Sequence, residues 1–230
     1  MIMGMDSLRL ALPDSAELGA ICDHLRACGF RLPDLELPGL HRVEDPLGTG
    51  THFDVFKLSP ADVGTYVEHG IAQLGVISTD LIREADSQVW RPFTFSYGHY
   101  PLVLAAPQGL TLDHLSSRPI MRLATSLPEL TRSLFTARGM SIEVVPVEDS
   151  PTACLLGLAD GYVDRLTDPG QLTAQGFRVL EVIGQAHLKL TLNRTCYSSR
   201  RSTISELIHR LYTCQPPEPD PITIPFDVDD

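Results

Sequence analysis

Residues 157–164 read GLADGYVD, and residues 165–172, which follow at once, read RLTDPGQL. Tyr162 and Val163 predict a short strand, and the run Asp168-Pro169-Gly170 predicts a turn in which a helix begins. α/β proteins commonly bind phosphate where a strand feeds a helix in this way, because the N–H groups and the helix dipole favour an anion. Here, however, Asp168 is itself anionic and Pro169 has no N–H to donate. The sequence keeps the frame of a phosphate site but alters the groups that would hold the phosphate.

The rest of the chain alternates between strand and helix patterns. Apolar β-prone runs predict strands at 8–12, 54–58, 74–77, 102–106, 121–125, 142–147, 162–166, 177–183 and 188–193. Helical spacing and capping residues predict helices at 16–28, 60–69, 128–138, 150–158, 169–175 and 202–213, with another beginning at 78–80. The segment 33–52, rich in Pro, Gly and His, is predicted to be a loop. This alternation is typical of an α/β fold with a mostly parallel or mixed sheet and helices on both faces.

The alternation loses its clear pattern in two places, near 92–101 and near 184–187. Two such crossings predict a discontinuous two-lobe chain. Residues 1–95 with 186–214 form lobe I, and 96–185 form lobe II, which carries the turn at 168–171. The tail, 215–230, is rich in Pro and Asp and is expected to be disordered or loosely docked. A ligand is expected in the cleft between the lobes.

Composition narrows the class of protein. The formal net charge is −11, from 18 basic and 29 acidic residues, which argues against a broad nucleic-acid-binding face. No apolar run has the length of a membrane span, and the N-terminus lacks a signal-peptide pattern, so neither membrane insertion nor export is expected. Five Cys and eight His residues show no metal-type spacing. We therefore expect a cytoplasmic protein with free thiols and no dedicated metal site.

A set of short motifs, in a fixed order, identifies a family. They are TYVEHG at 65–70, Leu74-Gly75, Asp80, Gly98, LAT at 123–125, PELTR at 128–132, Phe135, Gly139, GLAD at 157–160 and Val163-Asp164. Together they resemble the short form of ATP phosphoribosyltransferase, over roughly residues 7–195. Each motif alone is weak, whereas the set in this order is specific.

The resemblance implies two α/β lobes like those of type II periplasmic binding proteins. It implies a glycosyltransferase that condenses ATP with phosphoribosyl pyrophosphate, with Mg²⁺ carried by the substrate, in the first step of histidine biosynthesis. It also implies a hetero-oligomer with a regulatory subunit that is similar to histidyl-tRNA synthetase. By the same resemblance, phosphoribosyl pyrophosphate would bind at Asp160, Asp164, Asp168, Gly170 and Gln171, and ATP at Asp80, Gly98 and Thr125. No residue is assigned as catalytic.

Each acidic residue in that set also has a simpler explanation. Asp160 could cap a turn, and Asp164 could be a solvent-facing residue of a strand. Asp168 could be the N-cap of its own helix and so fill the anion position with its own carboxylate. Asp80 could stabilise the first turn of a helix without any ligand. The sequence leaves both explanations open at each position.

The chain departs from the family pattern where that pattern binds polyanions. The family's first turn, Pro-Lys-Gly-Arg, is here Pro13-Asp14-Ser15-Ala16, and its Thr-Gly-x-Thr phosphate loop aligns with Asp168-Pro169-Gly170-Gln171. Other expected basic residues fall on Ser59, Thr79 and Ser126. A charged hydrogen bond to phosphate contributes about 1.5–3 kcal/mol, so losing several predicts weak substrate binding. Three hypotheses follow: an active or weakly active enzyme, a non-catalytic subunit of a hetero-oligomer, or a module that binds a less charged small ligand.

Overall fold

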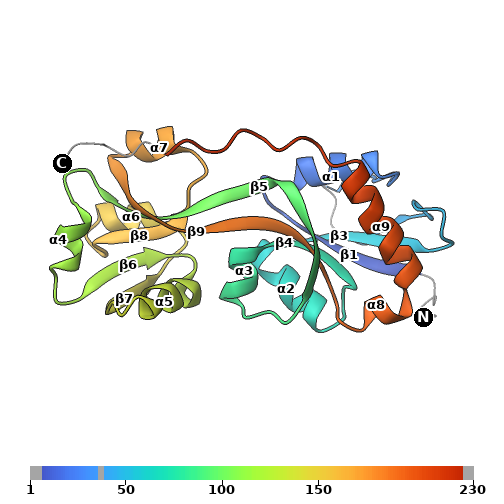
Figure 1. The fold of residues 1–230 in the computed structure, drawn as a ribbon, viewed down its shortest axis with the longest axis horizontal. Coiled ribbons are helices and arrows are strands. Elements are labelled where there is room, and N and C mark those ends of the chain that lie inside the picture. The colour runs from blue at the N-terminus through green and yellow to red at the C-terminus, as the bar shows by residue number, and fades with distance from the viewer. Residues whose placement is uncertain (1–6, 36–38, 225–230) are drawn as a thin grey trace. The chain divides into compact units, whose positions relative to one another are not determined.

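Contacts within the chain divide it into two units in a computed structural model that describes residues 7–35 and 39–224 (Figure 1). Of the described residues, the first unit contains 7–35 and 39–98 together with His187–Pro219. The second contains His99–Ala186 and residues 220–224. These divisions fall within a few residues of the predicted lobe boundaries, except that the tail is shared between the units.

The first unit is built around the parallel strands β1 (Ser7–Pro13), β3 (His52–Leu58) and β4 (Leu74–Ser78). The short strand β2 (His41–Val43) pairs antiparallel with β3, and β9 (Phe177–Leu192) pairs antiparallel with β4. The helices of this unit are α1 (Leu18–Ala27), α2 (Pro60–Glu68), α3 (Thr79–Glu84), α8 (Cys196–Ser199) and α9 (Arg201–Thr213).

Helices cover both faces of this part of the sheet, and β1 is therefore buried on both sides. Leu8, Leu10 and Leu12 pack in one cluster with residues of α1 and α9. Ala11, which points to the opposite face, packs in a second cluster with residues of α2 and α3. Strands buried on both faces are typically continuous apolar runs, which explains why LRLAL at 8–12 does not alternate strictly with polar residues.

The second unit has the parallel strands β6 (Met121–Thr125), β7 (Ile142–Pro146) and β8 (Gly161–Arg165), with β6 between the other two. Strand β5 (Trp90–Pro107) pairs antiparallel with β8 through its second half. The helices here are α4 (Leu112–Ser116), α5 (Pro128–Ala137), α6 (Ser150–Leu155) and α7 (Pro169–Ala174). The hydrogen-bonded strand order through both units is β2-β3-β1-β4-β9-β5-β8-β6-β7.

Several predictions about the elements are wrong. The segment 92–101 is part of one strand, β5, and 177–192 is a single strand, β9, rather than two. Phe93 and Phe95 are both buried on one side of β5, and Pro92 lies near the start of the strand, where a missing N–H is tolerated. The predicted loop at 33–52 contains β2, and α4 and α8 were not predicted. The predicted fold class is confirmed, and of its two alternatives the sheet is mixed, because β5 and β9 pair antiparallel with their neighbours.

The tail is also more ordered than predicted over its described part, 215–224. The Ser96 hydroxyl donates a hydrogen bond to the carbonyl oxygen of Pro216 at 2.7 Å. Ile222 and Ile224 pack against the core of the second unit. Residues 225–230 lie outside the described residues. The tail is rich in Pro and Asp on average, but Ile222 and Ile224 stand two positions apart. In an extended segment both side chains point to the same face, which is enough to hold the segment on the core of the second unit.

Arg210 of α9 forms hydrogen bonds with the end of α1 and with the loop at 44–51 that connects β2 to β3. Its guanidinium donates to the carbonyl oxygens of Cys28, Pro46 and Leu47 at 3.1, 3.0 and 2.9 Å. Space for it depends on a nearby glycine, Gly29, which has φ +101° and where an added Cβ would lie 2.9 Å from the Pro46 oxygen. One side chain thus joins three segments that are distant in sequence.

We predict that Arg210→Met lowers the free energy of unfolding by about 2 kcal/mol, because the three carbonyl oxygens lose a charged donor that water only partly replaces. Urea unfolding followed by circular dichroism measures this. The control is Arg26→Met on α1, an exposed arginine that forms an ion pair with Asp23 three residues away, which should change stability by less than about 0.5 kcal/mol. Equal effects of the two substitutions would contradict this role of Arg210.

Candidate functional site

A pocket of about 260 Å³ lies in the second unit, where the end of β8 meets the first residues of α6 and α7. It contains the turn singled out by the sequence. The lining residues are Asp149, Pro151, Tyr162, Asp164, Arg165, Leu166, Thr167, Asp168, Gln171, Leu172 and Gln175.

Asp168 is the N-cap of α7. Its Oδ1 accepts hydrogen bonds from the backbone N–H groups of Gly170 and Gln171, at 2.8 and 3.1 Å. Pro169 occupies the first turn and contributes no N–H. The N–H groups that a phosphate would use in this turn are therefore bound to a carboxylate of the chain itself.

The same arrangement occurs at the other helix that borders the pocket. Asp149 is the N-cap of α6, and its Oδ1 accepts from the backbone N–H of Thr152 at 3.2 Å. Pro151 again stands in the first turn. Both helices that open onto this pocket thus begin with an Asp that satisfies the helix and a Pro that removes a donor.

The charge of the lining is negative. It contains three carboxylates, Asp149, Asp164 and Asp168, and one guanidinium, Arg165. Asp164 Oδ1 also accepts a hydrogen bond from the Arg165 backbone N–H at 2.8 Å. Like charges a few ångströms apart near a protein surface repel by a few kcal/mol, so the lining opposes a bare diphosphate and favours a cation or a metal-chelated phosphate.

Asp160 is not among the residues that line the pocket. Its carboxylate is buried, with 4% of the side chain exposed, and forms ion pairs with Arg118 and Arg122. The backbone N–H of Arg122 also donates to it at 2.9 Å. Burial by itself raises the pKa of this carboxyl, but the hydrogen bonds from Arg122 and the charges of both arginines outweigh burial and lower the pKa below its ordinary value. In the structure Asp160 joins β6 and β8 within the second unit.

Of the other residues expected at the phosphoribosyl site, three line the pocket and one does not. Asp164, Asp168 and Gln171 line the pocket. Gly170 does not line it and contributes an N–H to the Asp168 cap. Their roles toward a substrate stay predictions.

Each residue expected to bind ATP has a structural contact in its own unit. Asp80, in the first turn of α3, is buried and accepts a hydrogen bond from the Ser78 hydroxyl. Gly98 has φ +69°, and an added Cβ would lie 3.0 Å from the Leu188 Cβ. Thr125, fully buried in the second unit, accepts from the Leu127 N–H at 2.9 Å. These contacts explain the residue types without a nucleotide, and ATP binding at them stays a prediction.

Asp149, Tyr162 and Arg165 line the pocket but were not predicted. For Asp149 a signal was present, because Asp149-Ser150-Pro151 carries the same pairing of an Asp with a first-turn Pro as Asp168-Pro169. Neither Tyr162 nor Arg165 stands out in the sequence, since each reads as an ordinary strand residue.

Three further observations concern metal sites, membrane-spanning helices and the cysteines. Among residues 7–35 and 39–224, no group of three or more His, Cys, Asp or Glu side chains is placed to hold a metal ion. Within the same ranges, none of the helices is both long enough and apolar enough to cross a membrane. All five cysteines are free thiols.

We predict that Asp160→Asn lowers the free energy of unfolding by about 1–3 kcal/mol at pH 7, because the charged hydrogen bonds are weakened. The folded carboxyl has a lowered pKa, so its contribution is complete above the unfolded value of about 3.9 and is lost as pH falls through the folded value. Wild type and variant should therefore converge below about pH 4 in urea unfolding. Glu129→Gln, which removes an exposed pair with Arg132, is the control. A difference that stays constant down to about pH 3 would contradict this assignment.

Comparison with known proteins identifies the family. A family profile described as ATP phosphoribosyltransferase matches residues 59–213. A protein named ATP phosphoribosyltransferase from Symbiobacterium thermophilum is 34% identical over 212 residues, covering 90% of this chain and 94% of that protein. One of the same name from Halothermothrix orenii is 30% identical over 209 residues, with 90% and 94% covered.

Solved structures agree on the fold. The ATP phosphoribosyl transferase (HisG:HisZ) complex from Thermotoga maritima matches with a TM-score of 0.75 at 24% identity, over 90% of this chain and 98% of that one. The periplasmic aliphatic sulphonate binding protein SsuA from Escherichia coli matches with a TM-score of 0.61 at 13% identity, over 91% and 72%. The likeness to type II periplasmic binding proteins is thus confirmed. On the profile and the sequence relatives, this chain belongs to the ATP phosphoribosyltransferase family.

Proposed function

We propose that this protein condenses ATP with phosphoribosyl pyrophosphate to give phosphoribosyl-ATP and pyrophosphate, the first step of histidine biosynthesis. The observation that carries the proposal is the family match, since relatives named for this reaction align with 90% of the chain. The five free thiols fit the reducing cytoplasm in which we propose that it acts.

The pocket at 168–171 is the proposed place for the phosphoribosyl group. Its three carboxylates suit a substrate whose diphosphate arrives chelated to Mg²⁺, because carboxylate oxygens can face the ion in place of the phosphate oxygens. Asp164 and Asp168 would then face the ion or the ribose hydroxyls. Binding without Mg²⁺ should be poor.

Weak substrate binding is part of this proposal. At the first turn after β1, where the family carries two basic residues, Asp14 stands instead. It forms an ion pair with Lys57 at 3.3 Å, which neutralises one of the two lysines of the chain. With both the first turn and the 168–171 turn altered, the substrate has lost several charged contacts, each of about 1.5–3 kcal/mol.

The partner in this proposal is a regulatory subunit similar to histidyl-tRNA synthetase, in a hetero-oligomer. Support comes from the matched Thermotoga maritima structure, which is a HisG:HisZ complex. The Asp168 cap favours a second candidate, a non-catalytic subunit that keeps the fold and assembles with an active one.

The proposed activity is tested by incubating the purified chain with ATP, phosphoribosyl pyrophosphate and Mg²⁺, with and without the regulatory subunit. Mass spectrometry should detect phosphoribosyl-ATP, and formation should stop without Mg²⁺. A Gln171→Glu variant adds a fourth carboxylate to the lining and should lower KM for Mg²⁺-chelated phosphoribosyl pyrophosphate about tenfold, because it adds an oxygen ligand that faces the ion. Gln185→Glu adds the same charge at an exposed residue of β9 outside the lining and should leave KM unchanged. Folded protein that gives no product in either mixture would favour the non-catalytic candidate.

We also predict that restoring the family's phosphate loop strengthens phosphate binding. The triple change Asp168→Thr, Pro169→Gly and Gln171→Thr removes a carboxylate and adds an N–H, while a threonine still caps α7. Phosphate should raise the Tm of this variant more than that of wild type in a thermal-shift titration. Asp62→Thr, in the first turn of α2, controls for the loss of one acidic residue. Equal Tm shifts in the variant and wild type would count against phosphate binding at this turn.

A further inference from the structure

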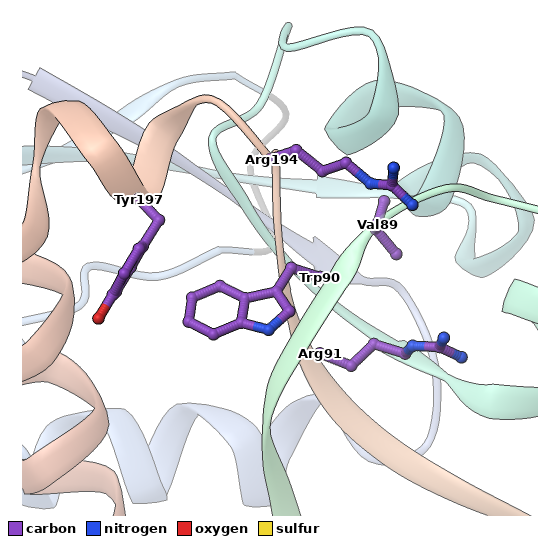
Figure 2. Close-up of a pocket in the computed structure, with 5 residues that line it drawn as sticks. All are labelled: Val89, Trp90, Arg91, Arg194 and Tyr197. Carbon is purple, nitrogen blue, oxygen red and sulfur yellow. The ribbon is translucent and has the colours of Figure 1, made fainter.

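A pocket with an aromatic and basic lining lies in the first unit, and its lining includes none of the residues discussed above as substrate contacts. Its volume is about 510 Å³, and it is lined by Val89, Trp90, Arg91, Arg194 and Tyr197. Figure 2 shows Trp90 in the middle, Tyr197 on one side of it and the two arginine side chains on the other. Pockets of roughly 300–1,000 Å³ are the usual size for small organic ligands.

The aromatic part of this site is preformed. Trp90 is 41% exposed, although it is the largest apolar side chain of the protein. It is held by Tyr197, whose ring meets it edge to face with centroids 4.6 Å apart and planes at 69°. Because the two rings are nearly perpendicular, a face of the indole stays available to a second flat ring. Aromatic rings pack favourably in offset-stacked or edge-to-face arrangements.

The basic part is not neutralised by the protein. Arg194 is held by a neutral side chain, with its Nη2 donating to Gln88 Oε1 at 3.2 Å. Within residues 7–35 and 39–224, neither Arg91 nor Arg194 forms an ion pair with a carboxylate. None of the described residues that line the pocket is acidic. In a chain of net charge −11, two exposed guanidiniums without a carboxylate form a local positive site.

A third cation adds to this charge. Lys189 of β9 is half-buried, and its pKa is lowered first by burial and then by the charge of Arg91. Its ammonium donates to the Thr94 hydroxyl rather than to a carboxylate. An anion beside Arg91 would relieve this repulsion, because guanidinium and carboxylate or phosphate groups form charge-assisted pairs.

We propose that the Trp90 pocket binds a small organic anion with a flat ring, which stacks on the indole while its carboxylate or phosphate pairs with Arg91 and Arg194. The lining shares no residue with the predicted ATP contacts, and Gly98 lies eight residues further along β5 than Trp90, which is about 26 Å of extended strand. The proposal does not depend on the transferase reaction.

The chain offers a direct probe, because Trp90 is its only tryptophan. Emission excited at the red edge of tryptophan absorption, where the six tyrosines absorb little, therefore reports on this pocket. We would titrate it with two anions, AMP and phenylacetate, and with their neutral counterparts, adenosine and phenylacetamide. At least one anion should change the emission saturably and bind about tenfold more tightly than its counterpart, and the stronger one tells whether phosphate or carboxylate is preferred. If neither anion changes the emission, the proposal fails.

Variants locate the effect. Arg91→Gln and Arg194→Gln should each weaken binding of the responding anion about fivefold or more, and added salt should weaken it further in wild type. Arg26→Gln removes the same charge from an exposed helix of the same unit and should bind as wild type does. Circular dichroism and the unliganded emission spectrum verify folding. Wild-type affinity in the Arg91→Gln/Arg194→Gln double variant would overturn the proposal. Emission that depends on protein concentration and not on the anions would overturn it as well, since a second copy would then cover Trp90.

Discussion

The N–H groups at the start of α7 can satisfy one acceptor at a time, and the chain supplies that acceptor itself. The Asp168 carboxylate takes both the Gly170 and Gln171 donors. A phosphate that displaced it would lose about 1 kcal/mol of capping and leave a carboxylate beside its own negative charge. The competition is unequal, because the side chain is covalently fixed within reach, whereas the ligand must give up its freedom to bind. The weak phosphate binding proposed for this pocket follows from that occupancy, and the negative lining adds the preference proposed for a metal-chelated substrate.

The sequence offered the N-cap role of Asp168 as one explanation but gave no sign of the ion pairs of Asp160. The reason is that the first interaction is local in sequence and the second is not. Asp168 caps donors two and three residues away, so Asp-Pro-Gly is a local signal that the sequence displays. Asp160 is fixed by Arg118 and Arg122, which lie 42 and 38 residues earlier and reach it only through the pairing of β6 with β8. The family resemblance suggested a ligand role at Asp160, and no pattern in the chain pointed to the two arginines.

The fold shows the same division. Strands with continuous apolar runs, such as β1, β4 and β6, were predicted close to their observed bounds. The first half of β5 was missed because Pro92 and Pro101 suggest a break, whereas burial of Phe93 and Phe95 in the first unit stabilises an extended backbone there. The described part of the tail was missed because its composition is polar on average, and two isoleucines are enough to dock it. Tertiary burial overrode local composition in both segments.

The uneven distribution of charge predicts opposite ligand preferences for the two pockets. The second-unit pocket has three carboxylates and one guanidinium, whereas the first-unit pocket has two guanidiniums, an indole and no carboxylate. The carboxylates of the second-unit pocket suit the Mg²⁺ ion of a chelated polyanion, and the guanidiniums of the first-unit pocket suit a free organic anion.

The net charge of −11 alone would predict that the whole surface attracts cations and repels anions. The local pairing of each arginine decides otherwise, because Asp160 binds both Arg118 and Arg122, while Arg91 and Arg194 pair with no carboxylate in the part of the chain that the structure describes. Selectivity in this chain therefore depends less on how many basic residues it has than on which of them its own carboxylates have already bound.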